Sequence, residues 1–173
     1  MVALIGVALA LDPTHAGRRD WIVVALVLSM LGDVFLMLPR DLFVAGLASF
    51  LLAHVAYVIG FRVRGGSGAA WAVAAVAVLI VDAVLARPVL AAVRSRHRDL
   101  IVPVVAYMLV LSAMVSAAVA TGVALAIAGA ALFFASDTLI AWNRFVRPQP
   151  WMPLAIIVTY HLGQTGLVLS LAR

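Results

Sequence analysis

The feature that most constrains the fold of this chain is a series of apolar runs, each about long enough to cross a lipid bilayer. A membrane-spanning helix needs ~20 mostly apolar residues. The stretch 1–11 is too short for this, and its pattern is typical of the later part of a helix. Runs of 18 to 22 residues, bounded by charged residues, Pro or Gly, occur at 21–38, 42–61, 69–86, 100–120, 122–142 and 151–172.

The composition excludes a soluble globular domain. The chain is 66% hydrophobic and 11% charged, with a mean hydropathy of +1.20, whereas soluble domains are about 45–50% apolar and about 25% charged. The runs are continuous and do not alternate, which excludes a transmembrane barrel and favours helices that satisfy their own backbone groups. We therefore predict one all-α domain over residues 1–173, a polytopic transmembrane helical bundle with six full spans and a partial N-terminal helix.

The use of charged residues narrows the setting of the protein. Every basic residue is Arg, every acidic residue is Asp, and Cys is absent. Such usage is typical of a GC-rich genome, and with the apolar runs it predicts an integral protein of a bacterial plasma membrane. Neither a disulfide nor a thiolate metal site is possible without Cys. No loop interleaves arginines with aromatic residues, so we expect no nucleic-acid binding.

Alternate connections between the runs differ in their arginine content. The connections 39–41, 87–99 and 143–150 together carry seven arginines, against five on the other side. Cytoplasmic loops of membrane proteins carry an excess of basic residues. We therefore predict that these three connections, called here the arginine-rich end, face the cytoplasm.

Three carboxylates interrupt the apolar runs. Asp33, Asp82 and Asp137 each lie four or five residues before the end of a predicted helix, on the side of the arginine-rich end. At ~1.5 Å per residue, the three carboxylates lie roughly 6–8 Å from the helix ends on that side. A charged residue near a helix centre costs at least ~2.5–3.5 kcal/mol, so such residues face the bundle interior and usually have a function. The structural alternatives are pairing of Asp82 with Arg87, and interhelical hydrogen bonds from Asp33 and Asp137.

Other polar residues fall deeper in the predicted spans. His54 and His161 lie ten to twelve residues from the arginine-rich end of their helices, with Tyr107 above them and Gln164 below. The pattern predicts a polar funnel that opens at the arginine-rich end, with carboxylates near its mouth and imidazoles toward the midplane. Phe50, which shares a helix face with His54, fits either packing or a pocket wall.

Carboxylates in such a funnel suit acid–base chemistry. If Asp33 and Asp137 meet in a desolvated site, both cannot ionise, so the pair titrates as a unit and supplies a general acid and a general base. The sequence contains no HExxH or comparable ligand spacing and no GxSxG. We therefore expect no metal, no cofactor and no serine nucleophile.

Three segments of the chain resemble the YhhN-like family, whose animal members are membrane lysoplasmalogenases. The segments are LGDVFLMLPRDLFVAGLASFLLAHVAYVIGF (31–61), GAALFFASDTLIAWNRF (129–145) and YHLGQTGLVLS (160–170). The resemblance implies an eight-helix bundle that hydrolyses the vinyl ether bond of lysoplasmalogen to a fatty aldehyde and a glycerophospho-base. On this basis we expect the chain to lack the first helix of the family and part of the second. The expected partners are a lyso-phospholipid substrate and membrane lipids.

The resemblance also implies roles for particular residues. By their motifs, Asp33 and Asp137 are the expected catalytic pair. We expect a cavity for a single acyl-like chain, with Arg144 or Arg40 available to a lipid phosphate and no room for a second chain. The residues expected to bind substrate are Phe50, His54, Tyr57, Tyr107, Tyr160, His161, Gln164 and Arg144, with Phe133 and Met108 lining the deeper part.

Two other functions stay open at this stage. A proton-coupled small-molecule carrier could use the same carboxylates as a relay. A lipid-binding or structural membrane protein would need no catalytic pair. The carrier is disfavoured because the chain shows no internal repeat and because Pro103 interrupts its predicted span only near the start.

Overall fold

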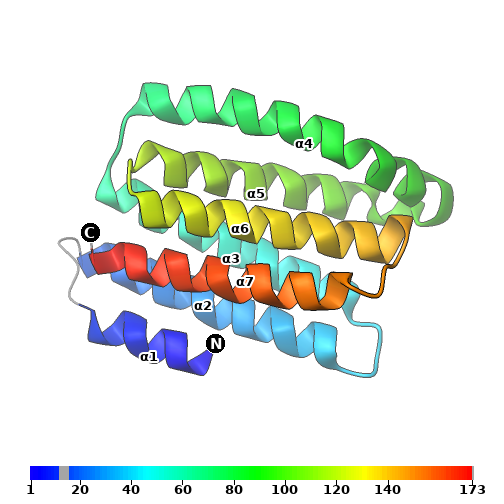
Figure 1. The fold of residues 1–173 in the computed structure, drawn as a ribbon, viewed down its shortest axis with the longest axis horizontal. Coiled ribbons are helices and arrows are strands. Elements are labelled where there is room, and N and C mark those ends of the chain that lie inside the picture. Colours follow the sequence, from blue (N-terminus) through cyan, green and yellow to red (C-terminus); the bar gives the residue numbers. More distant parts are fainter. Residues whose placement is uncertain (12–15, 173) are drawn as a thin grey trace.

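The structure, a computed structural model, describes residues 1–11 and 16–172. It is built from helices that run roughly parallel or antiparallel to one another (Figure 1). The helices are α1 (Val2–Ala10), α2 (Ala16–Met37), α3 (Phe43–Arg64), α4 (Gly68–Arg96), η1 (Arg98–Leu100), α5 (Ile101–Ala120), α6 (Ala124–Ala141), η2 (Trp142–Val146), α7 (Met152–Leu169) and η3 (Ser170–Ala172).

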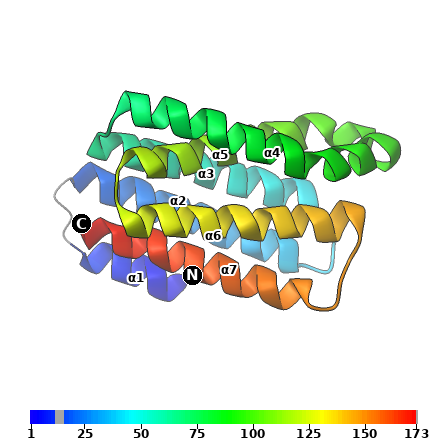
Figure 2. The ribbon, with the colours of Figure 1, turned by 45° about the horizontal axis from the view of Figure 1, so that its top comes forward.

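The prediction of an all-α bundle with six full spans and a partial N-terminal helix is confirmed. In the part of the chain that the structure describes, six helices are long and apolar enough to cross a membrane. The short helix α1 lies against α2 and α7 at the edge of the bundle (Figures 1 and 2). The most extensive contacts join α2 to α3, α6 to α7, and α4 to α5, and α3 also packs on α5.

The predicted boundary of α4 is wrong. The helix continues through Pro88 to Arg96, ten residues beyond its predicted end at residue 86. A proline inside a helix removes one backbone donor. Here tertiary packing outweighs that local cost, because Val89 and Val93 beyond the proline are buried in a cluster with Phe145.

The beginning of α2 also differs from the prediction. The helix begins five residues before the predicted start at residue 21, so Arg18 lies within it. The guanidinium of Arg18 is buried and donates a hydrogen bond of 2.9 Å to Ser170 Oγ. A long side chain can thus bring its charge to a polar partner from within an apolar segment.

Close contact between α6 and α7 depends on glycine. A Cβ on Gly163 would lie 3.0 Å from the carbonyl oxygen of Gly129 and 3.0 Å from the amide nitrogen of Phe133. Small residues let helix backbones approach in this way inside membranes. The contact fixes the position of α6, which carries Asp137, relative to α7, which carries Tyr160.

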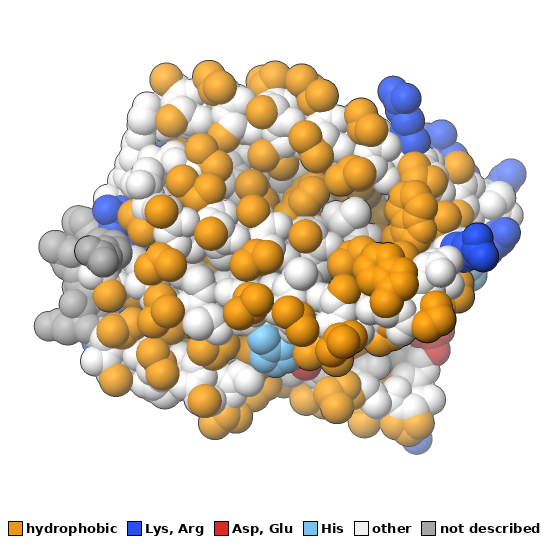
Figure 3. All heavy atoms as spheres, viewed as in Figure 1, with side chains coloured by type: hydrophobic (Ala, Val, Ile, Leu, Met, Phe, Trp, Pro, Cys, Tyr) orange, Lys and Arg blue, Asp and Glu red, His pale blue; other side chains and the backbone are white. Residues whose placement is uncertain are grey.

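The outer surface matches a protein that lies in lipid. Figure 3 shows a largely apolar face, with basic side chains gathered toward one end of the bundle. The turn between α2 and α3, the turn between α4 and α5, and the turn between α6 and α7 all lie at this end (Figures 1 and 2). The arginine-rich end therefore exists as a spatial unit, although residues 87–96 of it are helical. Its cytoplasmic orientation stays a prediction.

Candidate active site between α3, α4, α5 and α6

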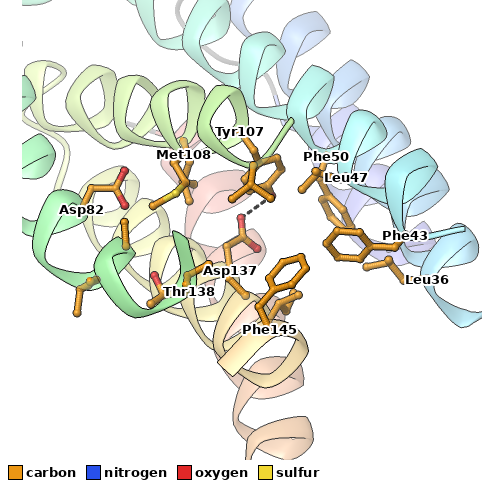
Figure 4. A pocket seen from close by; sticks show the side chains of 17 residues that line it. Leu36, Phe43, Leu47, Phe50, Asp82, Tyr107, Met108, Asp137, Thr138 and Phe145 are labelled. Atoms are coloured by element: carbon orange, nitrogen blue, oxygen red, sulfur yellow. Dashed lines mark hydrogen bonds between the residues drawn. The ribbon is translucent and has the colours of Figure 1, made fainter. Parts of the chain in front are cut away.

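An apolar pocket, called here the inner pocket, lies between α3, α4, α5 and α6 (Figure 4). Its cavity volume is about 70 Å³. Polar side chains line it at Asp82, Tyr107, Asp137 and Thr138. The remaining lining residues are Leu36, Phe43, Leu47, Phe50, Leu85, Ala86, Val89, Val104, Met108, Leu111, Ile140, Ala141 and Phe145.

Asp137 projects from α6 into this pocket and is 8% exposed. The hydroxyl of Tyr107 donates a hydrogen bond of 2.6 Å to its Oδ2 (Figure 4). Nε2 of His54 lies 3.5 Å from the same oxygen. The structure thus brings two of the predicted binding residues, one from α5 and one from α3, to the predicted catalytic carboxyl on α6.

The orientation of His54 follows from its second ring nitrogen. Nδ1 lies 2.6 Å from the carbonyl oxygen of Phe50, and a carbonyl can only accept, so Nδ1 is the donor. In a neutral imidazole the other nitrogen then carries a lone pair. His54 Nε2 is fully buried and has no hydrogen-bond partner within the described residues. A proton on Asp137 would therefore find an acceptor in His54.

Asp33 occupies a separate place. It is partly buried on α2, and its Oδ2 accepts a hydrogen bond of 3.0 Å from the hydroxyl of Tyr160 on α7. Asp33 does not line the inner pocket. No hydrogen bond joins Asp33 to Asp137 within residues 1–11 and 16–172, because each carboxylate is held by a different tyrosine.

The ring of Phe50 lies between the two carboxylate sites. It lines the inner pocket and makes an edge contact with Tyr160 at 5.9 Å between ring centroids. It also covers Gly32, where an added Cβ would lie 2.6 Å from the ring. Phe50 thus packs on Tyr160, which holds Asp33, and also forms part of the wall of the pocket that Asp137 lines.

Tyr57 and Gln164 belong to the core and not to the expected pocket wall. Both are fully buried, and the Tyr57 hydroxyl donates to Gln164 Oε1. Phe133 closes this region through edge contacts with Tyr57 at 6.4 Å and with His54 at 4.7 Å. The expected cavity does not run past Gln164 and Phe133, because these residues pack in the core and do not line the inner pocket.

The expectation that His161 lies inside the bundle is wrong. His161 is exposed on the outer surface of α7, and its Nδ1 lies 2.9 Å from the carbonyl oxygen of Ile157. Successive residues of an α-helix are ~100° apart, so an inward Tyr160 turns its neighbour outward. The inward face of α7 runs through Tyr160, Gln164 and Leu167, and this spacing could have excluded His161.

The expected pairing of Asp82 with Arg87 is also wrong. Asp82 is 8% exposed and lines the inner pocket, whereas Arg87 is exposed. Oδ2 of Asp82 accepts a hydrogen bond of 2.9 Å from Ser112 Oγ on α5. Because α4 extends to Arg96, Asp82 lies at the middle of its helix, fourteen residues from either end. The pair of serines one turn apart on α5, Ser112 and Ser116, was the sequence signal that could have indicated its partner.

A second, polar pocket, called here the outer pocket, lies at the arginine-rich end. Its cavity volume is about 280 Å³, and its walls include Arg40, Asp41 and Arg144. It shares Leu36 and Phe43 with the inner pocket, so the two spaces adjoin. Arg144 belongs to η2, a single π-helical turn, and such turns often occur at functional sites.

Arg144 is already engaged at this pocket. Its Nη2 lies 2.6 Å from Asp41 Oδ2, and its guanidinium lies 4.9 Å above the ring centroid of Phe43. The hydrogen bond from Arg144 holds the pKa of Asp41 below its ordinary value. No group of three or more His, Asp, Glu or Cys side chains that could hold a metal ion occurs among the residues described.

Comparisons with known proteins agree with this architecture. The sequence profile of the YhhN family matches residues 1–171. Lysoplasmalogenase TMEM86B of Homo sapiens is 33% identical over 174 residues, which cover 100% of this chain and 72% of the human protein. The pig protein of the same name is 32% identical and covers 86% of this chain and 62% of its own length. The lysoplasmalogenase of Mycobacterium tuberculosis is 34% identical and covers 92% of this chain and 63% of its own length.

The chain thus spans from 62% to 72% of the length of these relatives. No solved structure matches it. The similarities support a membrane hydrolase that resembles the lysoplasmalogenases.

Proposed function

The chain belongs to the YhhN family, and from that premise we propose that it hydrolyses the vinyl ether bond of a lysoplasmalogen inside the membrane. The products are a fatty aldehyde and a glycerophospho-base. The observation that carries this proposal is Asp137, a carboxyl that accepts a hydrogen bond from Tyr107 and lies 3.5 Å from His54 Nε2, on the wall of an apolar pocket.

The adjoining pockets fit the shape of a single-chain phospholipid. The outer pocket presents Arg40 and Arg144, and guanidinium groups match phosphate geometry. The inner pocket is almost entirely apolar and suits a hydrocarbon chain. A lipid that spans both pockets would hold its vinyl ether between phosphate and tail, in the region where Asp137 lines the wall.

Vinyl ether hydrolysis begins with transfer of a proton to carbon. In this proposal Asp137 donates the proton from its carboxyl to the β carbon of the vinyl ether, and the α carbon becomes an oxocarbenium ion. Water then adds to the α carbon and gives a hemiacetal. Collapse of the hemiacetal releases the aldehyde and returns a hydroxyl to the glycerol. Tyr107 and His54 hold Asp137 in place for the first step.

Asp33 has a different role in this proposal. An anion near a developing cation lowers its free energy, and the effect is strong where water is excluded. Tyr160 fixes the orientation of the Asp33 carboxylate, and Tyr160 packs on Phe50, which lines the inner pocket. We assign Asp33 the stabilisation of the oxocarbenium ion from outside the pocket.

The direct test is release of aldehyde by the purified protein. Lysoplasmalogen should yield aldehyde, an ordinary acyl lysophospholipid should yield none, and a two-chain plasmalogen should react far more slowly. Asp99→Asn is the control variant and should release aldehyde as the wild type does, because Asp99 is exposed at the arginine-rich end and lines neither pocket. A folded protein that releases no aldehyde from lysoplasmalogen would contradict the proposal and favour the carrier or lipid-binding alternatives.

A further inference from the structure

Asp82 is the second carboxylate that lines the inner pocket, and the proposed reaction so far leaves it unused. It projects from α4, and Asp137 projects from α6 (Figure 4). Both residues are 8% exposed. None of the residues that line this pocket is Lys, Arg or His. Asp82 therefore faces the pocket without a cation among its walls.

The hydrogen bonds of the pocket leave one acceptor available on Asp82. Ser112 donates to Oδ2, and a carboxylate can accept on both oxygens. The other lining hydroxyls are engaged elsewhere, since Tyr107 donates to Asp137 and Thr138 donates to the carbonyl of Phe134. A molecule in the pocket can therefore donate to the remaining oxygen of Asp82.

Water is the donor that the proposed reaction requires. Each turnover consumes one water molecule, and a water in an apolar pocket needs polar partners to stay there. The cavity volume of about 70 Å³ exceeds the roughly 10–15 Å³ that a cavity needs to hold one water molecule. Asp82 and Asp137 are the two carboxylates that line this pocket, and in the proposed reaction Asp137 delivers the proton.

We propose that Asp82, held by Ser112, binds the hydrolytic water and accepts its proton, while Asp137 protonates the vinyl ether carbon from another wall of the same pocket. This inference rests on the proposed function. Asp137 loses a proton to the β carbon, and the water oxygen bonds to the α carbon as its proton passes to Asp82. The proton on Asp82 then returns to Asp137 through the pocket water, and one water is consumed overall.

The arrangement parallels a known solution for another oxocarbenium reaction. Inverting glycosidases use two carboxyl groups, one as acid and one as base, with room between them for the attacking water. Asp33 does not fit the part of the base, because it does not line the pocket. In this proposal Asp33 stabilises the positive charge of the oxocarbenium ion, whereas Asp82 binds and deprotonates the water.

The competing account is structural, since the Asp82–Ser112 hydrogen bond also joins α4 to α5. Two substitutions separate the accounts. Asp82→Asn keeps an oxygen that can accept from Ser112 but cannot take a proton. Ser112→Ala removes the interhelical bond but leaves the carboxylate in the pocket.

The experiment measures kcat, KM and thermal unfolding of both variants in detergent, with lysoplasmalogen as substrate. We expect Asp82→Asn to lose ~10²-fold or more in kcat, the usual effect of removing a general base, with little change in KM. Ser112→Ala should lose only a few-fold in kcat. Formate added to Asp82→Ala should restore part of the aldehyde release, because it supplies a carboxylate base in the vacated space, and it should leave Asp99→Asn unaffected.

The opposite pattern would overturn the inference. Asp82→Asn with normal kcat, or Ser112→Ala with a loss as large as that of Asp82→Asn, would assign Asp82 to helix packing. So would Asp82→Ala that formate cannot restore. If the wild-type protein itself releases no aldehyde, the proposed function fails, and this result is distinct from a failure confined to the Asp82 variants.

Discussion

The sites of Asp137 and Asp33 look alike in composition but differ in what they open onto. Each carboxylate sits in an apolar helix and accepts a hydrogen bond from a tyrosine on another helix. Asp137 is almost fully buried and lines a pocket, with His54 as a second neighbour. Asp33 is partly buried at the contact of α2 with α7, behind the ring of Phe50.

This difference shows that the presence of a carboxylate in a membrane helix is not enough to identify it as catalytic. Both residues incur the same cost of placing an acidic group among apolar side chains. Access to a cavity decides which of them can touch a substrate. By that criterion we propose Asp137 and Asp82 as the reacting carboxyls, with Asp33 acting from outside the pocket.

The sharpest test of the comparison is Asp137→Asn. An amide keeps the acceptor for Tyr107 but cannot deliver a proton, so we expect kcat to fall by ~10²–10⁴-fold with the fold retained. Aldehyde release and the melting temperature in detergent measure the two quantities. Near-normal turnover in this variant would remove the proton donor from the proposed reaction.

Asp33→Asn should have a smaller effect. It removes a negative charge near the cation but no reacting group, so we expect a loss of about 10²-fold in kcat, at the low end for lost electrostatic stabilisation. Steady-state kinetics beside Asp137→Asn give the ratio of the two losses. Equal losses would break the comparison and mean that Asp33 enters the pocket during turnover.

Phe50→Leu tests the layer between the two sites. The shorter side chain leaves the contact with Tyr160 unfilled, and we expect unfolding to become easier by about 0.5–3 kcal/mol. Phe61→Leu is the matched control, because Phe61 is equally buried but lies away from Asp33. If the two variants lose the same stability and the same activity, Phe50 has no special position between the sites.

Asp41→Asn tests a carboxylate outside the membrane spans, where water can solvate the charge of Asp41. Arg144 holds the pKa of Asp41 below its ordinary value, so the pair contributes stability above the unfolded pKa of about 3.9. That contribution is lost as the pH falls through the lower folded pKa. We expect a small drop in melting temperature for the variant at neutral pH and no difference in strong acid. If the difference in melting temperature between the wild type and Asp41→Asn grew as the pH fell, the predicted pH dependence would be wrong.

His161→Ala should have the smallest effect. The imidazole lies on the outer surface of α7 and contacts Tyr160 only through ring edges at 5.1 Å. Surface substitutions usually change stability by no more than about 0.5 kcal/mol. Kinetics that match the wild type would sharpen the assignment of His161 to the exterior, whereas a large loss of kcat would return it to the site.

Much of the architecture could be predicted from the order of residues. The lengths of the apolar runs indicate the spans, because a bilayer imposes a minimum number of residues on any helix that crosses it. Local rules failed at Pro88, where burial of Val89 and Val93 carries α4 onward. They failed also at His161, where helical phase and not depth decides which way the side chain points.

The candidate site divides in the same way. Asp33, Asp82 and Asp137 stand out in the sequence, since an acidic residue in an apolar run is costly wherever it lies. Which two of them share a cavity depends on Ser112 of α5, Tyr107 of α5 and Phe50 of α3. These neighbours are remote in the chain, so no local pattern could assign them. The sequence determined that three carboxyls are buried in a helical bundle, and only the packing of the helices decided which of them face a pocket.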